Sequence, residues 1–270
     1  MVERTHRSGE KEPMPIQETD NSFEVSMLAG QTDRPGTGLT FQCAHTIDEV
    51  VDAWQLVYTA YRRKKLIHPN RQRLHTTRYA VGNHATVITG RMGPLVVSTM
   101  TAILDNPVGL PLDRVYSDDL DSLRARGRKM MEISLFADRR ENLARSSASL
   151  LQLMRFAWQW GISKNVTDFV IGVHPRHARF YSRAFGFEPS GPERTYPAVN
   201  DHPVVFLRGE PAIQLARNPM PRGLEYFAQN PIDPAEFERR YRFPTADVGS
   251  SPIDSFLNDS PVSHCDDGEV

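Results

Sequence analysis

The sequence contains only two cysteines, Cys43 and Cys265, and they lie far apart in its 270 residues. This spacing matches neither a disulfide framework nor a common zinc-binding motif. No apolar run approaches the roughly 18 residues of a transmembrane helix, and the first residues lack the apolar segment of a signal peptide. We therefore expect a reduced, cytoplasmic protein without a structural metal or a transmembrane segment.

A strong excess of charge of either sign is also missing. The formal net charge is −1 at pH 7, so a nucleic-acid partner recognised through a basic chain is not expected. Internal repeats are absent as well. Hydrophobic residues make up 39% of the chain and charged residues 24%, which allows one folded domain with polar tails.

The two ends of the chain differ in composition from its middle. Residues 1–38 are polar and contain several prolines, and we expect them to be disordered because they bury little apolar surface. Residues 243–270 contain six acidic residues but no lysine or arginine, which predicts a disordered acidic tail. The folded domain is expected at residues 39–210. Residues 211–242 form a helical extension with one helix, which Asp233 would cap.

Periodicity predicts the elements of the first half. Apolar residues at helical spacing indicate a helix over residues 46–61, where Thr46 and Glu49 form a capping box. Residues 85–88 and 95–104 read as a strand hairpin. Ser117 is expected to begin a short helix, which ends at Gly127. Basic clusters follow at 62–65, 124–129 and 139–140, and each is suited either to solvent or to an acidic partner.

The most informative stretch spans residues 130–187. It predicts a strand from Met130, a polar loop at 142–147, a nearly all-apolar helix at 149–160, a strand at 169–173 and a final helix that carries Tyr181. Packing so apolar a helix requires a sheet, and the preceding strands supply one. The order is a mostly antiparallel sheet followed by strand, helix, strand and helix.

Glu132 lies between apolar residues of the predicted central strand. Burial of a carboxylate costs free energy unless the group is paired or has a functional role. Burial also raises the carboxyl pKa towards the range of a general base. Because strand side chains alternate, Glu132 should share a face with Met130 and Ser134, and Met131 and Ile133 should point the other way. The alternative is a structural carboxylate paired with an arginine.

Three further residues lie where the last strand meets the last helix. His174 and His177 flank Pro175 at the end of a strand, a common position for ligand sites in α/β proteins. Each histidine could equally cap the helix or face solvent. Tyr181 follows on the helix, where a tyrosine could also simply pack on the sheet.

The block His174-Pro175-x-His177-x-x-Phe180-Tyr181 followed by Phe185-Gly186-Phe187 resembles the last helix and strand of the acetyltransferase-like (GNAT) superfamily. Residues 46–207 more specifically resemble the long-chain N-acyl amino acid synthases. The matching segments are Gly109-Leu110-Pro111-Leu112-Asp113, Leu123-Arg124-x-x-Gly127-Arg128 and the histidine–tyrosine block. Residues 131–137 are also similar to the central strand of acyl-homoserine-lactone synthases, which usually have Arg where this chain has Leu135.

The resemblance implies an α+β, GNAT-like acyltransferase fold whose mostly antiparallel sheet is flanked by helices. It implies transfer of a long fatty acyl chain from acyl carrier protein to the amine of an amino acid, with the phosphopantetheine thioester as donor substrate and no other cofactor. Glu132 would be the base, and Tyr181 would protonate the leaving thiol. The expected substrate-binding residues are Ser134, Phe136, Arg145, Ser147, His174 and His177.

Three other functions stay open at this point. A lactone synthase would use the same donor. A coenzyme A-dependent acetyltransferase would need the superfamily's glycine-rich phosphate loop, but Arg145 and Ser147 stand where those glycines would be. This departure favours a carrier-protein thioester, whose single phosphate Arg145 and the serine hydroxyls of this segment could hold. The third alternative is a non-catalytic module that binds acyl chains or the carrier protein.

Overall fold

The computed structural model describes residues 38–140 and 143–243, with only the backbone for 143–146. Residues 1–37 and 244–270 lie outside the described residues, and with them nearly all of the two tails for which disorder is predicted. Phe243, the first residue assigned to the acidic tail, is buried instead, and its ring stacks on Trp54 with centroids 6.2 Å apart.

Eight strands are present in the described part of the chain. They are β1 (Leu39–Cys43), β2 (Ala85–Met92), β3 (Leu95–Leu104), β4 (Met130–Asp138), β5 (Asp168–Val173), β6 (Glu188–Pro189), β7 (Arg194–Tyr196) and β8 (His202–Gly209). The order across the sheet is β1-β2-β3-β4-β5-β8-β6, and β7 pairs with β8. Among these pairs β4 and β5 alone are parallel, which confirms a mixed, mostly antiparallel sheet.

Seven α-helices accompany these strands within the described residues. They are α2 (Ile47–Arg63), α3 (Asp113–Ala125), α4 (Leu143–Ser163), α5 (Pro175–Phe185), α6 (Pro211–Ala216), α7 (Arg222–Gln229) and α8 (Pro234–Glu238). Short 3-10 turns lie at Arg78–Ala80 and Pro197–Val199. No helix among the described residues is long and apolar enough to cross a membrane.

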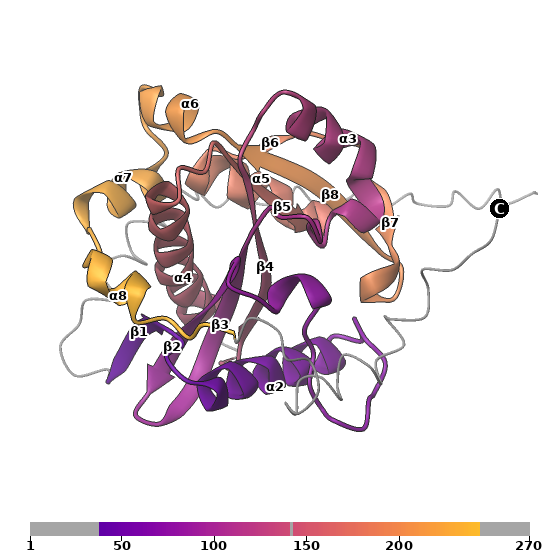
Figure 1. Ribbon diagram of the computed structural model, residues 1–270, viewed down its shortest axis with the longest axis vertical. Coiled ribbons are helices and arrows are strands. Elements are labelled where there is room, and N and C mark those ends of the chain that lie inside the picture. Colours follow the sequence, from indigo (N-terminus) through magenta and orange to yellow (C-terminus); the bar gives the residue numbers. More distant parts are fainter. Residues whose placement is uncertain (1–37, 141–142, 244–270) are drawn as a thin grey trace, which may run out of the picture.

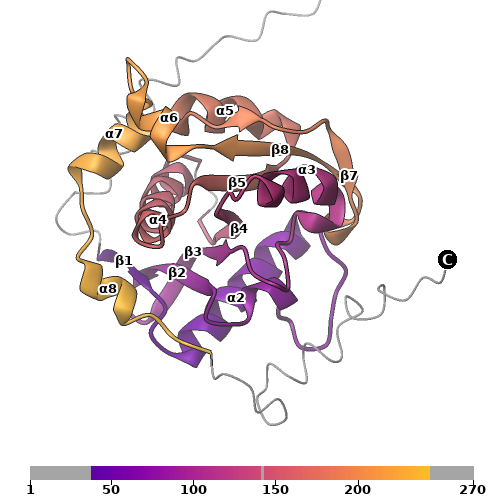
Figure 2. The same cartoon turned by 45° about the horizontal axis from the view of Figure 1, so that its top comes forward.

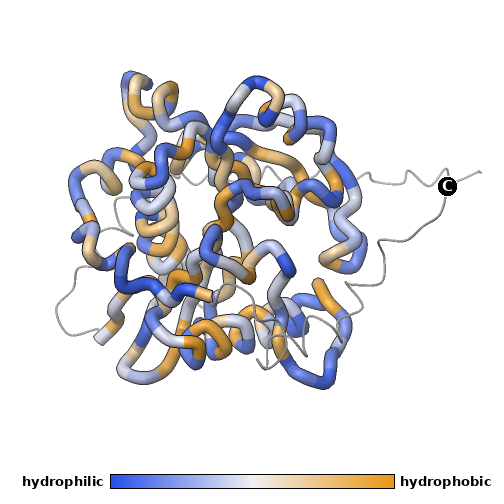
Figure 3. Tube along the Cα trace, viewed as in Figure 1, coloured by the Kyte–Doolittle hydropathy of each residue, from blue (hydrophilic) through white to orange (hydrophobic). Residues whose placement is uncertain are grey.

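Helices cover both faces of the sheet (Figures 1 and 2). One core lies between the sheet and α4, where the apolar residues of α4 pack with Met131 and Ile133, and it continues to α5 and α7. A second core holds residues of α2 and α3 against the other face, including Met130. Hydrophobic segments run along α2, whereas many peripheral connections are hydrophilic (Figure 3). Glu132, between Met131 and Ile133, therefore belongs to the α2–α3 side.

The start of α2 follows the predicted capping chemistry with one difference. Thr46 accepts a hydrogen bond from the Glu49 backbone N–H at 3.3 Å. The Glu49 carboxylate does not return to Thr46 but accepts the His45 N–H at 2.6 Å and pairs with Arg91. The cap thus fixes the helix start and also ties it to the end of β2.

Two helix boundaries differ from the predictions. Helix α3 begins at Asp113 rather than Ser117, and its backbone kinks at Tyr116, where φ is −127°. Helix α4 begins at Leu143 rather than Ser149, so the loop predicted at 142–147 is helical from Leu143 onward. Local polarity misled the prediction in both cases, because tertiary packing extends helices through polar residues.

The C-terminal segment contains three helices where the sequence predicts one. The Asp233 side chain accepts the Ala235 N–H at 2.9 Å, which confirms the predicted cap of α8. Helix α7 packs on α5, and the Phe227 and Phe185 rings stack with centroids 5.6 Å apart. The core predicted to end near residue 210 therefore continues to Phe243.

Candidate active site

The site is organised around the point where β4 and β5 part. Their ladder consists of three residue pairs and ends at Glu132, which faces Val170. Beyond this pair β4 continues to Asp138, while β5 remains paired with β8. Glu132 thus stands at the apex of the separation between the two central strands.

A bulge in β4 follows the apex directly. Thr99 of β3 pairs with Ala137 and Thr101 pairs with Ser134, so Leu135 and Phe136 together oppose Met100. Leu135 has a φ of 53°, which is unusual for a branched residue and marks local strain. The extra residue reverses the alternation, so Leu135 and Ala137 join the α2–α3 core and Phe136 packs towards α4.

Glu132 is 3% exposed, and its Oε2 accepts the Leu112 backbone N–H at 2.9 Å. The pKa of the Glu132 carboxyl is raised to about 8, chiefly by burial and also by the charge of Asp113. Hydrogen bonds from Leu112 and Ser134 act in the opposite direction. Within the described residues no arginine pairs with Glu132, so the predicted structural alternative is absent from this environment.

The loop that supplies the Leu112 N–H is held by ion pairs. Asp113 accepts the Leu110 N–H at 2.6 Å, and Arg124 contacts both Asp113, at 2.7 Å, and Asp105, at 2.8 Å. Two of the segments quoted for the resemblance, around residues 109–113 and 123–128, therefore meet here. They act together to position Glu132.

The basic cluster at 124–129 is largely structural. Arg124 holds the loop, and Arg128 pairs with Asp168, which is fully buried at the start of β5 and also pairs with Arg208. These ion pairs lower the pKa of Asp168 despite its burial. In the predicted basic cluster at 139–140, Arg140 pairs with Asp138. The charges of these three arginines, Arg124, Arg128 and Arg140, are therefore engaged within the protein and are not free to bind an acidic partner.

Tyr181 lies on α5 and is half-buried against Phe185 and Phe187, with ring centroids 6.1 and 6.3 Å away. Its hydroxyl has no hydrogen-bond partner among the described residues. Burial raises the pKa of Tyr181, and so does Tyr61 of α2. Tyr181 is therefore a protonated donor at neutral pH.

Tyr61 connects the two predicted catalytic residues electrostatically. Burial and then the Glu132 carboxylate raise the pKa of Tyr61 to about 12, while Tyr61 in turn acts on Tyr181. Tyr61, Tyr181 and Ser134 are each half-buried, so each keeps some accessible surface. Tyr61 ends the apolar face of the helix predicted at 46–61. Its position directly before the basic cluster at 62–65 was the one sequence signal that could have marked it as a site residue.

The two histidines lie at the N-terminus of α5. His174 caps the helix through Nδ1, which accepts the Arg176 N–H at 3.3 Å, so the structure supports the capping alternative. Burial lowers the pKa of His177, with contributions from Arg176, His174 and Lys64. Lys64 ends α2, so the ends of α2 and α5 bring a group of basic residues together.

The remaining predicted binding residues lie at the start of α4. Arg145 falls in the first turn of α4, and its side chain lies outside the described residues. Ser147 lies two residues further on and is half-buried. Because α4 begins at Leu143, any phosphate contact in this region would come from a helix N-terminus rather than from the loop predicted before it.

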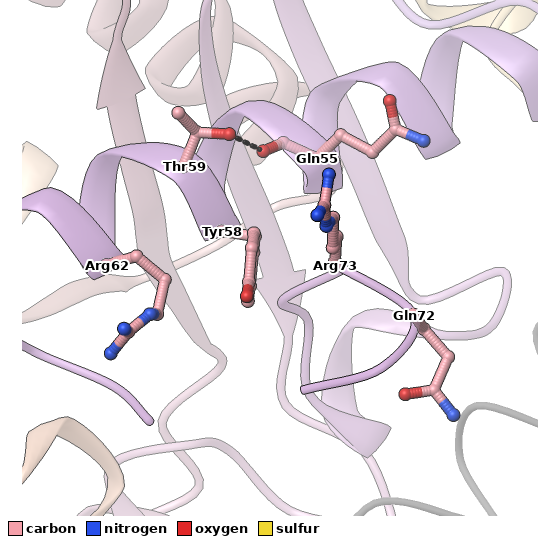
Figure 4. A pocket seen from close by; sticks show the side chains of 6 residues that line it. All are labelled: Gln55, Tyr58, Thr59, Arg62, Gln72 and Arg73. Atoms are coloured by element: carbon pink, nitrogen blue, oxygen red, sulfur yellow. Dashed lines mark hydrogen bonds between the residues drawn. The ribbon is translucent and has the colours of Figure 1, made fainter. Parts of the chain in front are cut away.

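A polar pocket lies elsewhere, between α2 and the segment that follows it (Figure 4). Its lining includes two arginines, Arg62 and Arg73, together with Tyr58 and polar side chains. None of the predicted site residues lines this pocket. Among the described residues no group of three or more histidine, cysteine or acidic side chains could hold a metal ion.

The raised pKa of Glu132 predicts a specific dependence of stability on pH. A carboxyl that titrates near 4.5 when unfolded and about 8 when folded holds its proton more tightly in the folded state. Its contribution to stability is fully present below pH 4.5 and is lost as the pH rises to 8. Glu132→Gln should therefore gain stability over wild type across this window, by up to about 5 kcal/mol.

Urea denaturation of both proteins between pH 5 and pH 9 would measure this difference. The comparison cancels the opposite contribution of His75, where burial lowers the pKa to about 4. A constant difference in the free energy of unfolding across this range would show that the Glu132 carboxyl titrates near its usual value.

Comparison with solved structures shows which fold the chain has. The structure of FeeM, an N-acyl amino acid synthase from uncultured soil microbes, superposes with a TM-score of 0.56 at 22% identity over 64% of this chain and 90% of that one. The TofI structure, a ternary complex with an inhibitor and MTA, gives 0.51 at 13% identity over 73% of this chain and 98% of that one. For the AHL synthase LasI the values are 0.48 and 15%, over 64% and 88% of the two chains. The fold is that of the GNAT-like acyltransferases.

The family follows from the sequence. The N-acyl amino acid synthase FeeM family matches residues 52–210, more than half of the chain. No curated protein sequence matches. The chain belongs to the FeeM family of N-acyl amino acid synthases and is an N-acyltransferase. The family match ends before α6, so the helices that complete the α4 core lie outside it.

Proposed function

We propose that this N-acyltransferase moves a long fatty acyl chain from an acyl carrier protein thioester to the amine of an amino acid, in the cytoplasm. The observation that carries the proposal is the position of Glu132, which is buried at the apex of the β4–β5 separation and has a pKa of about 8. A base works best when its pKa lies near the operating pH. The arriving ammonium group would further favour the charged carboxylate.

The reaction would proceed in a recess that we place at the β4–β5 separation, between Glu132, Tyr61 and Tyr181. Glu132 takes a proton from the acceptor's ammonium, and the free amine then attacks the thioester carbonyl. A carbon–nitrogen bond forms, and the negative charge develops on the carbonyl oxygen. Backbone N–H groups of β4 beyond Glu132, where the β4–β5 ladder has ended, are suited to stabilise that oxygen.

The intermediate collapses with cleavage of the carbon–sulfur bond. Its nitrogen loses a second proton to solvent as the amide forms, and Glu132 returns its own proton to solvent. Tyr181 gives its proton to the departing thiolate, and solvent later restores it. The products are an amide, the free phosphopantetheine thiol and one proton released to solvent. Ser134, which donates a hydrogen bond to Glu132, is placed to orient the acceptor beside the base. The proposed chemistry uses the thioester donor and the amine acceptor, without a further cofactor.

A panel experiment tests the assignment of substrates. The purified protein is incubated with acyl thioesters of carrier protein and of coenzyme A, of several chain lengths, and with a mixture of amino acids. Mass spectrometry should find N-acyl amino acids, formed fastest from long-chain carrier-protein thioesters. A lactone product, or equal rates from short coenzyme A thioesters, would assign one of the alternative functions.

The basic residues where α2 ends and α5 begins support a carrier protein as donor. Lys64 and Lys65 are exposed, and the pKa of Lys64 is lowered first by desolvation and then by the charges of Arg63 and Arg176. So dense a cluster of positive charge near the recess suits an acidic partner. The double change of Lys64 and Lys65 to Glu should raise KM for the acyl carrier protein roughly tenfold at low salt.

The matched control for this variant reverses two exposed charges elsewhere, with Arg126→Glu and Lys129→Glu. It changes the net charge equally but should leave KM for the carrier protein nearly unchanged. KM for an acyl-pantetheine donor should be unaffected by either variant, because that donor has no protein surface. Equal effects of the two variants would remove the α2–α5 cluster as the docking surface.

A further inference from the structure

A single peptide group connects Glu132 to a residue more than sixty positions away in the sequence. The Pro111–Leu112 peptide donates its N–H to Glu132 at 2.9 Å and accepts, at its carbonyl oxygen, the Tyr196 hydroxyl at 3.0 Å. Tyr196 ends β7, which pairs only with β8 among the described residues. The three groups form one chain of hydrogen bonds from the phenol through the amide to the carboxylate.

We propose that Tyr196 is a positioning residue for Glu132, which acts through the Pro111–Leu112 peptide. The proposal deepens the function proposed above, since it takes Glu132 as the base. Tyr196 touches no reacting atom in this arrangement. It sets both the orientation and the donor strength of the N–H group that holds the carboxylate.

Two physical effects support this role. A hydroxyl that donates to an amide carbonyl polarises the amide, and the N–H of the same group becomes a stronger donor. The chain is also largely removed from water, because Leu112 is fully buried and Tyr196 is half-buried against the same core. Two polar groups of this turn make the contacts: the Pro111 carbonyl accepts from Tyr196, and the Leu112 N–H donates to Glu132. Pro111 itself has no N–H.

The loop is braced independently on its other side. Asp113 and Arg124 hold it through contacts that do not involve Tyr196. Loss of the Tyr196 hydroxyl should therefore alter the Glu132 hydrogen bond without releasing the loop. This independence separates a positioning role from a purely structural one.

The other titratable groups near Glu132 stay unchanged in this test. Asp113 of α3 raises the pKa of Glu132, and Tyr61 of α2 responds to the Glu132 charge. Burial raises the pKa of Tyr196, the Glu132 charge also raises it, and Arg114, Tyr61 and Tyr79 act on it as well. Tyr196→Phe removes one hydroxyl from this group and adds no charge, so a shift in the Glu132 titration reports the hydrogen-bond chain.

The expected shift is upward. The Leu112 N–H stabilises the charged carboxylate, and a weaker donor stabilises it less. A strengthening of 10–30% along the chain corresponds to a change of roughly half a pKa unit or less when Tyr196→Phe removes it. The low-pH limb of kcat/KM should move upward by the same amount, while KM for the acyl donor stays as in wild type.

The matched control is Tyr116→Phe. Tyr116 is fully buried, and its hydroxyl lies 2.7 Å from the Pro192 carbonyl oxygen and 2.9 Å from that of Val204. It secures the β7–β8 region in the same chemical way but is not connected to Glu132. Its loss should lower stability without moving the Glu132 titration.

The experiment follows the carboxyl carbon of Glu132 by NMR in glutamate-labelled, substrate-free protein, with Glu132→Gln to assign the signal. The proposal requires an upward shift in Tyr196→Phe and none in Tyr116→Phe. The same pKa in wild type and Tyr196→Phe, or equal shifts in both variants, would overturn it. A shift in Tyr196→Phe without any change in the pH–rate profile would confirm the hydrogen-bond chain and reject Glu132 as the base.

Discussion

Glu132→Gln should lower turnover at pH 7 by about 10²–10⁴, the usual cost of losing a general base. The fold should survive, because glutamine has the same shape and its side-chain oxygen can still accept the Leu112 N–H. In wild type, kcat/KM should rise with pH up to about 8, where Glu132 titrates, and the variant should lack this limb. Above that pH the defect should shrink, since more acceptor arrives as the free amine.

The control for this variant is Glu236→Gln, the same chemical change at another carboxylate. Glu236 accepts the Cys43 N–H at 2.9 Å and lies on α8, outside the recess. Its loss should affect stability but leave turnover nearly unchanged. Steady-state kinetics of both variants from pH 6 to pH 10 measure the difference. Near-normal turnover of Glu132→Gln at neutral pH would remove Glu132 from the mechanism.

The second large effect is expected for Arg124→Ala, which should lower the free energy of unfolding by about 3 kcal/mol. Arg124 lies between Asp105 and Asp113, whose side chains are 15% and 20% exposed. Without the guanidinium group these two carboxylates are left partly buried and repel each other. Turnover should fall as well, because the loop that holds Glu132 loosens.

Arg126→Ala provides a matched control two residues further along. Its guanidinium is exposed and donates to Ser122. Removal of an exposed side chain of this kind typically changes stability by less than about 0.5 kcal/mol. Thermal and urea denaturation of both variants should show this contrast. Equal effects would mean that the Arg124 ion pairs contribute no more than surface charges.

Much of the central region could be predicted from the sequence because its elements are strongly patterned. The alternation in β4 placed Glu132 opposite Met131 and Ile133, and the two cores confirm that placement. The capping residues of α2 and α8 could also be predicted from the sequence, because a cap is a local interaction.

The bulge in β4 could not be predicted in the same way. Strict alternation puts Phe136 on the same face as Glu132, but the extra residue at Leu135 turns it towards α4. A bulge depends on the pairing with β3, and no local residue preference predicts it. Leu135, the position at which lactone synthases usually have Arg, is itself the residue with positive φ.

Long-range partners were equally beyond a local reading of the sequence. The cluster at 124–129 looked like a basic surface, because the acids that pair with Arg124 and Arg128 lie up to 82 residues away in the sequence. The sequence around Tyr196 likewise does not reveal its partner, for the same reason. Its connection to Glu132 exists only once β7 and the 109–113 loop are folded against each other.

The most direct test of the account is a single turnover with product stoichiometry. The enzyme is mixed with a limiting amount of acyl carrier protein thioester and an excess of amino acids. Free thiol and N-acyl amino acid are then measured at the same time points. We expect the two to appear together in equal amounts in wild type and both to be strongly slowed in Glu132→Gln. Thiol released without amide, or donor bound without thiol release, would contradict acyl transfer to an amine.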